Sequence, residues 1–179
     1  LTGIPLLKFS SDSGARAVES IRMDKSFLSQ RAKDKNSEIL DLVIVGAGVS
    51  GMAAALEAKK DDFHFQILEA TEPFSTIVNF PKGKPIFTYP TDMVPLGDLQ
   101  FTKEIKEPLV EEIKEQTLGK GIVPIMARVE KIEKKGDYFD IVIPKGENLK
   151  ARRVIVGIGR SGNFRKLGVP GENKEKVFN

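Results

Sequence analysis

The pattern of hydrophobic and polar residues between positions 41 and 70 predicts a β-α-β unit. Residues 41–45, DLVIV, form a short apolar run that ends in a glycine turn, which is typical of a buried strand. Residues 50–59 are alanine-rich and predict a helix, and residues 63–70, FHFQILEA, predict a second strand. The unit has about 30 residues, the size expected for two parallel strands joined by a helical crossover.

The second half of the chain predicts one more helix and then a group of strands. Apolar residues recur every four positions over 103–118, which predicts a helix that ends at Gly119. Residues 122–158 predict strands with a turn at Gly136. Apolar and polar positions alternate over 129–132 and 139–143, as they do in half-exposed antiparallel strands. The last of these segments, RVIVGIG at 153–159, is apolar on both faces, so we expect it to return to the buried sheet.

Two segments lack this regularity. Residues 1–38 are rich in Ser, Asp, Lys and Arg, and we interpret them as a leader or linker that carries at most one surface helix. Residues 71–98 contain five prolines, which interrupt both helices and strands. The aromatic and aliphatic residues of this second segment argue against disorder, and they leave two readings open, a packed surface loop or a wall of a ligand pocket.

Three glycines between the first strand and the first helix predict an anion-binding turn. A helix that starts directly after a strand presents unpaired amides and the positive end of its dipole, which together bind anions. Gly46 permits the tight turn, Gly48 lets a pyrophosphate come close, and Gly51 lets the helix pack on the strand. Glu69 follows about 20 residues on, where a carboxylate accepts hydrogen bonds from ribose hydroxyls and repels a 2′-phosphate. This predicts a dinucleotide site that disfavours NADP; the alternative is a glycine turn without a ligand and a solvated Glu69.

Composition narrows the remaining classes of function. Charged residues make up 30% of the chain, and its net charge of +3 is spread along it, so we expect no nucleic-acid partner. There is no cysteine, and His64, the single histidine, lies in a predicted strand. We therefore name no catalytic residue and no metal site. No apolar run approaches the roughly 20 residues of a membrane span, and no signal peptide is visible, so we expect a cytoplasmic protein without a membrane span.

Four stretches carry a family resemblance: DLVIVGAGVSGMAAA with ILEA, TIVNFPKGKPIF, ARVEKIEKKGDYFDIV, and RVIVGIGRSGNFRKLGVPGE. Together they resemble the FAD-dependent pyridine nucleotide-disulfide oxidoreductases of the thioredoxin-reductase-like group, over about residues 40–178. The pattern NFPKGKPIFTYPTDM…LGDLQF is similar to the branch that contains bacillithiol disulfide reductase-like proteins. The resemblance implies an α/β fold, with a Rossmann-like FAD-binding β-α-β unit and a small antiparallel β-meander.

The resemblance also implies FAD as the cofactor and assigns residues to its parts. The glycine turn would hold the pyrophosphate, Glu69 the adenosine ribose, the backbone at Val129 the adenine, and Asn79 the flavin edge. The triplet at 157–159 would make a second FAD contact, although the usual ATG of the family is GIG here. The predicted cofactor-binding residues are Gly46, Ala47, Gly48, Val49, Ser50, Gly51, Glu69, Ala70, Asn79, Val129, Gly157, Ile158 and Gly159.

On the same resemblance, residues 39–162 are the N-terminal portion of an FAD-binding domain, and 163–179 are a crossover toward an NAD(P)H domain absent from this chain. The domain would then be incomplete, and this fragment alone would be inactive. The parent protein would pass electrons from NAD(P)H through FAD to a disulfide or another redox acceptor, which could be a small molecule or a protein. A homodimer is one assembly that the sequence allows.

Two other classes of function stay open. An NAD-dependent Rossmann dehydrogenase shares the glycine turn and Glu69, but it explains neither the predicted meander nor the second glycine pair. A non-enzymatic module that binds FAD or a partner protein is the other alternative, with residues 1–38 as its docking segment.

Overall fold

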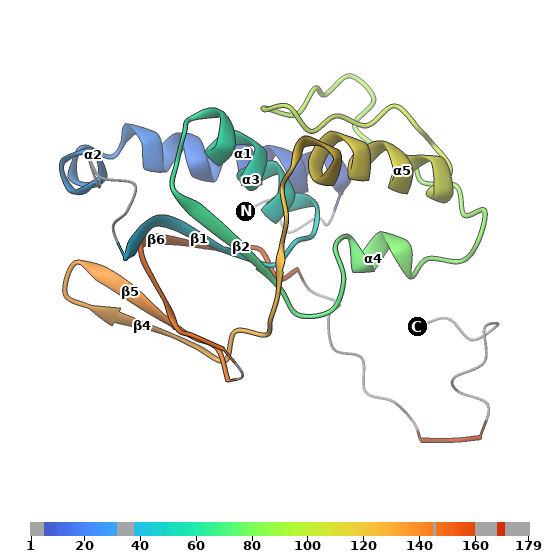
Figure 1. Ribbon diagram of the computed structural model, residues 1–179. Helices are drawn as coiled ribbons and strands as arrows, with labels where there is room; N and C mark the ends of the chain where they lie inside the picture. The colour runs from blue at the N-terminus through green and yellow to red at the C-terminus, as the bar shows by residue number, and fades with distance from the viewer. Residues whose placement is uncertain (1–5, 32–37, 145, 160–167, 171–179) are drawn as a thin grey trace.

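The computed structural model describes residues 6–31, 38–144, 146–159 and 168–170, and within them the chain forms one six-stranded sheet with helices on one side (Figure 1). The strands are β1 Ile39–Val45, β2 Phe65–Glu69, β3 Ile125–Met126, β4 Lys131–Lys135, β5 Tyr138–Val142 and β6 Leu149–Val156. The helices are α1 Leu7–Met23, α2 Lys25–Gln30, α3 Val49–Lys60, α4 Ser75–Val78 and α5 Lys106–Thr117, followed by the 3-10 turn Leu118–Lys120. None of these helices is both long and apolar enough to cross a membrane.

The strand order is β3-β2-β1-β6-β5-β4, and it combines parallel and antiparallel pairs. Strands β3, β2, β1 and β6 run parallel, whereas β5 is antiparallel to β6 and β4 is antiparallel to β5. This confirms the predicted β-α-β unit, the turn at Gly136 and the return of residues 153–156 to the sheet beside β1. The antiparallel strands predicted at 129–132 and 139–143 form as β4 and β5, whereas the short β3, which precedes them, pairs in parallel with β2.

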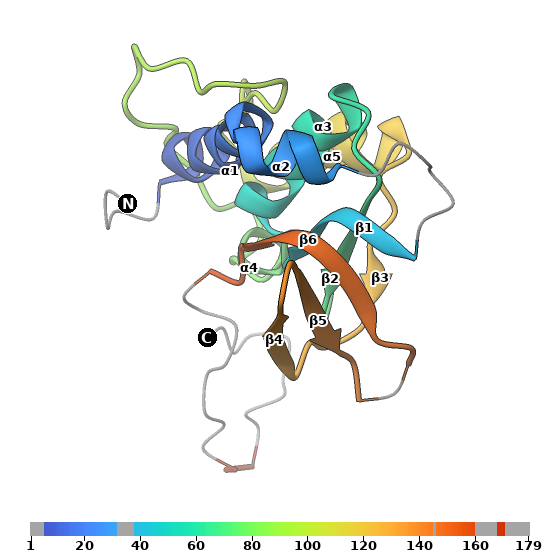
Figure 2. The ribbon, with the colours of Figure 1, turned by 90° about the vertical axis from the view of Figure 1, so that its left-hand side faces the viewer.

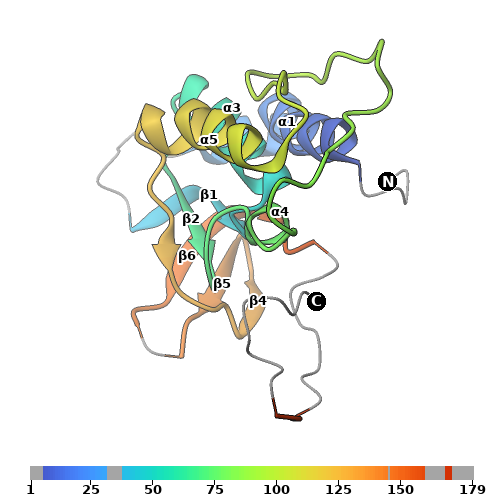
Figure 3. The same ribbon diagram turned by 90° about the vertical axis from the view of Figure 1, so that its right-hand side faces the viewer.

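The sheet has a core on each face. Leu42 and Ile44 of β1 point to the helical side, where they pack with α1, α3 and α5, whereas Val43 and Val45 point to the other side. On that second side the hairpin of β4 and β5 curls beneath the parallel strands, as Figures 2 and 3 show. Ile141 of β5 is fully buried there, so the hairpin covers the face that has no helices.

Helix α5 forms close to where the periodicity predicts it. Leu109 and Ile113 are fully buried and lie one turn apart, so the apolar spacing identifies the correct face. Ile105 stands outside this helix as its N-cap and is half exposed. The α-helix ends at Thr117, one residue before the predicted end, and a 3-10 turn continues to Lys120 before the chain reverses at Gly121, whose φ is 77°.

The N-terminal part of the chain differs most from expectation. In place of a leader or linker, α1 and α2 pack against the rest of the fold, and Ala15, Val18 and Phe27 are almost completely buried. The buried face of α1 consists mainly of small residues, which resemble linker composition in the sequence although the helix is amphipathic. Close contact with the alanine-rich α3 stabilises it, and this contact is visible only in three dimensions (Figure 1).

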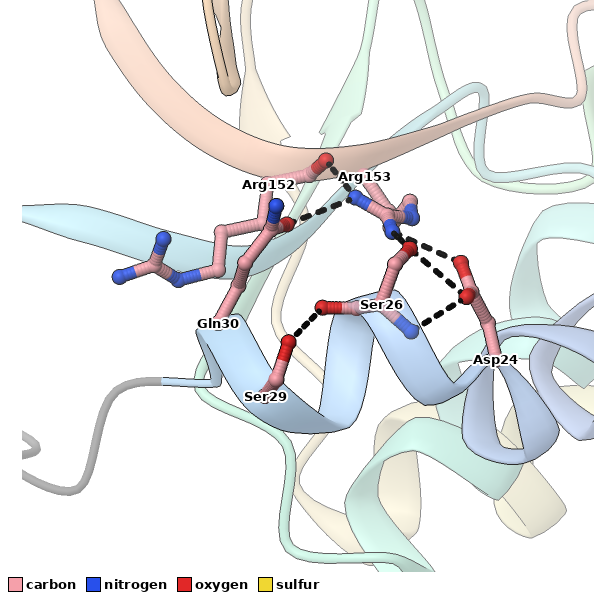
Figure 4. Close-up of polar contacts among 6 residues, drawn as sticks. All are labelled: Asp24, Ser26, Ser29, Gln30, Arg152 and Arg153. Atoms are coloured by element: carbon pink, nitrogen blue, oxygen red, sulfur yellow. Dashed lines mark hydrogen bonds and ion pairs between the residues drawn. The ribbon is translucent and has the colours of Figure 1, made fainter.

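Helix α2 is fastened to β6 by a polar cluster, which Figure 4 shows. One terminal nitrogen of Arg153 donates to Asp24 Oδ2 at 2.7 Å and to the hydroxyl of Ser26 at 2.9 Å. Asp24 also caps α2, because its Oδ1 accepts the amide of Ser26 at 2.8 Å. The bond from Arg153, together with those from Ser26, holds the pKa of the Asp24 carboxyl well below its usual range.

Apart from α4, the proline-rich segment 71–98 is a surface loop in which most residues are exposed. It is tied to α1, because Lys8 Nζ donates to the carbonyl oxygen of Pro90 at 2.7 Å, and Asp12 accepts the amide of Leu96 at 2.9 Å. Beyond its end, the hydroxyl of Ser11 donates to the carbonyl oxygen of Leu99. Its prolines leave few amides for regular structure, and side chains of α1 therefore bond to the carbonyls and amides of this loop.

Candidate functional site

The glycine-rich turn joins β1 to α3 at the carboxyl edge of the parallel strands. Gly46 has a φ of 103°, a conformation that residues with a Cβ rarely adopt. A Cβ built there would also lie 2.5 Å from the carbonyl oxygen of Gly157 in the segment after β6. A Cβ on Gly51 would lie only 1.8 Å from the carbonyl oxygen of Gly46. These two glycines are therefore required by the fold itself.

Gly48 differs from the other two glycines of the turn, Gly46 and Gly51. Its φ is −78°, and a Cβ there would meet no atom within 4 Å, so the protein leaves this space open. Gly48 is the N-cap of α3, and no side chain caps that helix. Because the first amides of an α-helix have no partner within it, the amides that follow Gly48 are available to an anion.

Glu69 binds the turn from the neighbouring strand. The residue is buried, with 9% of its surface exposed. Its Oε2 accepts a hydrogen bond from the amide of Ala47 at 2.7 Å, and its Oε1 accepts from the amide and the hydroxyl of Thr71 at 2.9 and 3.1 Å. A carboxylate offers about four acceptor positions, so one remains for a ligand hydroxyl. Glu69 therefore has a structural role at the turn in addition to the ribose contact that the sequence predicts.

A cleft of about 650 Å³ opens at this edge of the sheet, a size that suits a small-molecule ligand. It brings together most of the residues predicted from the sequence: Gly46, Gly48, Val49, Ser50, Glu69, Ala70, Val129, Gly157, Ile158 and Gly159. Ala47 and Gly51 are buried directly behind its wall. Asn79 is not among the lining residues, since it lies exposed at the end of α4.

Sequence reasoning missed several residues of the cleft. The turn of α4 contributes Phe74, Ser75 and Thr76, and the start of α1 contributes Leu7 and Ser10. The α4 residues belong to the segment 71–98, so the reading of that segment as a pocket wall holds for its first turn. Phe74 is held there by a bond to the glycine turn, because its amide donates to the carbonyl oxygen of Ala47 at 3.0 Å. No local sequence signal indicates the contribution of α1.

The fold and the glycine turn together are typical of dinucleotide-binding α/β proteins. The sequence profile of the family described as pyridine nucleotide-disulphide oxidoreductase matches residues 43–179. The chain therefore belongs to the pyridine nucleotide-disulphide oxidoreductase family, which confirms the resemblance stated above.

Individual relatives are about a quarter to a third identical to this chain over the aligned residues. A ferredoxin–NADP reductase from Lactococcus lactis subsp. cremoris is 30% identical over 78% of the chain, and a thioredoxin reductase from Ureaplasma parvum is 31% identical over 76% of it. The chain spans only 41% and 40% of these two relatives, and 42% of a ferredoxin–NADP reductase from Ignicoccus hospitalis. The chain thus corresponds to less than half of each of them.

Solved structures show the same fold. A bacillithiol disulfide reductase from Staphylococcus aureus superimposes with a TM-score of 0.62 at 22% identity, over 79% of this chain and 45% of that one. A thioredoxin reductase from Streptococcus pyogenes gives a TM-score of 0.53 at 28% identity, over 75% of this chain and 39% of that one. These likenesses confirm the predicted Rossmann-like α/β architecture.

Proposed function

We propose that this chain supplies the diphosphate- and ribose-binding part of an FAD site in an NAD(P)H-dependent flavoprotein oxidoreductase. The whole protein would pass electrons from NAD(P)H through the flavin to a disulfide or another redox acceptor. Membership of the family supports this class of function, and the relatives that bear the names thioredoxin reductase and ferredoxin–NADP reductase support a redox protein as one kind of acceptor.

The observation that carries this proposal is Gly48. Its φ is open to every residue type, and a side chain there would collide with nothing in the protein. The fold therefore gives no reason for a glycine at this position, in contrast to Gly46 and Gly51. A diphosphate on the first turn of α3 does give a reason, because a Cβ would stand between the phosphate and the helix amides.

The residues of the cleft suit the rest of the nucleotide as well. The amides that begin α3 would donate to the diphosphate, and the free acceptor position of Glu69 would receive a ribose hydroxyl. The half-buried Val129 and the exposed Ile158 offer apolar surface at the cleft, which suits the flat base of the adenosine or the flavin rings. When bound, the flavin itself would accept and release the electrons, while this chain holds and orients it.

An absorbance measurement on the full-length protein tests the proposal. We expect the purified protein to show the two visible bands of a bound flavin, and we expect anaerobic NADPH or NADH to bleach them. Protein that is folded but colourless, and that neither retains nor binds added FAD, would overturn the assignment. Binding of NADH without any flavin would instead favour an NAD-dependent dehydrogenase, and flavin that NAD(P)H cannot reduce would favour a non-enzymatic module.

A further inference from the structure

Helix α1 lies outside the matched region of the family, which begins at residue 43, yet it packs directly on the helix that follows the glycine turn. Figure 3 shows α1 at the same side of the sheet as α3. Leu7 and Ser10, from the first two turns of α1, line the same cleft as Gly48 and Val49.

The contact between the two helices is a backbone contact. A Cβ built on Gly14 would lie 2.0 Å from the carbonyl oxygen of Ser50 and 3.2 Å from the amide nitrogen of Ala54. A glycine is therefore required at position 14 for α1 to approach this closely. This approach fixes α1 relative to the first two turns of α3, where an anion would bind.

Two contacts establish that α1 and α3 run in the same direction and in a defined register. Gly14 is level with Ser50 and Ala54 of α3. Eight residues further along α1, Arg22 pairs with Asp61, the residue that follows α3, at 3.4 Å. Ser10 lies one turn before Gly14, about 6 Å closer to the cleft. By the same register Ser10 is level with Gly48, the residue at which the helix amides of α3 become available.

The charges near Ser10 are already engaged elsewhere. Lys8 is buried and donates to the carbonyl oxygens of Pro90 and Thr91, and Asp12 pairs with Arg16 and accepts the amide of Leu96. The first turn of α1 contains no acidic residue. The hydroxyl of Ser10 is thus a polar side chain that lines the cleft beside the glycine turn.

We propose that Ser10 is a further nucleotide-contacting residue, and that α1 forms a wall of the diphosphate part of the cleft, opposite the first turn of α3. This inference rests on the proposed function, because it assumes that a dinucleotide lies on the glycine turn. A serine hydroxyl can donate to a phosphate oxygen, and a phosphate within reach makes the electrostatics at position 10 sensitive to the sign of any introduced charge.

The test places opposite charges at position 10 and measures nucleotide affinity. The apoproteins compared are the full-length wild type, Ser10→Asp, Ser10→Asn and Ser10→Lys. Each is titrated with FAD, and binding is measured by the quenching of flavin fluorescence. A second titration adds ADP as a competitor. Ser20→Asp and Ser20→Lys are the matched controls, because Ser20 is exposed on the same helix, about 15 Å further from the cleft. That distance exceeds the Debye length of about 10 Å at 0.1 M salt. Thermal unfolding of each variant is recorded in parallel.

We expect the affinities for FAD and for ADP to fall in the order Lys, Asn, Asp at position 10, with roughly a tenfold difference between the extremes at 0.1 M salt. The difference should shrink at 0.5 M salt, and the Ser20 variants should bind like the wild type. An acidic residue near a helix N-terminus is favourable, so Ser10→Asp should remain folded while it loses affinity. If one charged variant fails to fold, comparing the other charged variant with Ser10→Asn still shows whether a charge at position 10 raises or lowers the affinity.

Equal affinities of the three position-10 variants, in a protein whose wild type binds FAD, would overturn the role of Ser10 and leave the proposed function intact. An affinity order that the Ser20 variants reproduce would also overturn it, since the effect would then be one of net charge. A wild type that binds neither FAD nor ADP contradicts the proposed function, and with it this inference.

Discussion

At the carboxyl end of β1 the chain omits side chains, whereas beside the amino-terminal half of the same strand it gathers charged and aromatic ones. The first region consists of Gly46, Gly48 and Gly51, with Glu69 as its one buried carboxylate. Its polar groups are mainly backbone amides. Such a surface binds an anion without the cost of burying a fixed charge.

The second region is held by ion pairs and by contacts of guanidinium groups and aromatic rings. Arg31 lies 3.3 Å from the buried carboxylate of Asp41, and its guanidinium lies 5.0 Å from the ring centre of Phe63. Phe63 packs on Phe27 at 5.2 Å between ring centres, and the guanidinium of Arg153 lies 5.5 Å from the ring of Phe27. Two contacting rings, with a guanidinium at each end, therefore connect β6 through α2 to the chain beside β1, and they attach the N-terminal helices to the sheet.

This difference shows why a search for charged clusters would select the wrong end of the molecule. The cluster of Asp24 and Arg153 has short bonds and a strongly lowered carboxyl pKa, features often taken as marks of a functional site. Its geometry is fully explained by the attachment of α2. The cleft at the other end has few charged groups, and its chemistry lies in amides exposed by the absence of side chains.

The largest effect should come from Gly51→Ala. Helix propensity alone would favour alanine by about 1 kcal/mol, but the added Cβ would lie 1.8 Å from the carbonyl oxygen of Gly46. We therefore expect a loss of stability near the upper end of the roughly 1–3 kcal/mol range for overpacking. Urea unfolding measures it, with Gly119→Ala as the control, because a Cβ there has its nearest neighbours at 3.8 Å. Equal stability of the two variants would show that the turn is looser than described.

Glu69→Ala should have the next largest effect. The change leaves the amides of Ala47 and Thr71 without their acceptor, and an unsatisfied buried donor costs about 1–3 kcal/mol. Glu69→Gln should lose less, because its amide oxygen can still accept one of these bonds. Both variants should bind FAD more weakly than the wild type. A stable Glu69→Ala with normal affinity would contradict both roles assigned to this carboxylate.

Gly48→Ala separates the effect of a side chain on ligand binding from its effect on the stability of the fold. The backbone at position 48 accepts alanine without strain, and replacing glycine at such a position stabilises a protein by about 0.4–1 kcal/mol. We expect unchanged or slightly raised stability together with at least a roughly tenfold loss of FAD affinity, about 1.4 kcal/mol. Thermal unfolding and fluorescence titration on the same samples separate the two quantities. Unchanged affinity would remove the main support for a diphosphate on this turn.

The sequence predicted the glycine turn because its signals are local. Gly46, Gly48 and Gly51 lie within six residues, and the strand, the helix and Glu69 occur at fixed offsets from them. The position of α1 could not be predicted, because its buried face includes Gly14 and Ala15, which read as linker composition until α3 is placed beside them. The pairing of β3 with β2 escaped prediction for a related reason, since parallel register depends on contacts between residues far apart in sequence.

The smallest effect is expected in the charged region, from Asp24→Asn, and it should change how the stability of the protein depends on pH. Because Arg153 lowers the pKa of Asp24 in the folded state, the unfolded chain takes up this proton first as the pH falls. The stability contributed by the pair is fully present well above the ordinary carboxyl value of 3.8 and is lost as the pH falls through that value and below it. Asp24→Asn should therefore be less stable than the wild type at pH 6 and lose less stability down to pH 2.

The FAD affinity of Asp24→Asn at pH 7 should be unchanged, because Arg153 lies four residues, about 13 Å, from Gly157 along β6. A parallel pH slope in the variant would assign the acid sensitivity to other carboxylates, and a loss of FAD affinity would show that the two ends of the sheet are coupled.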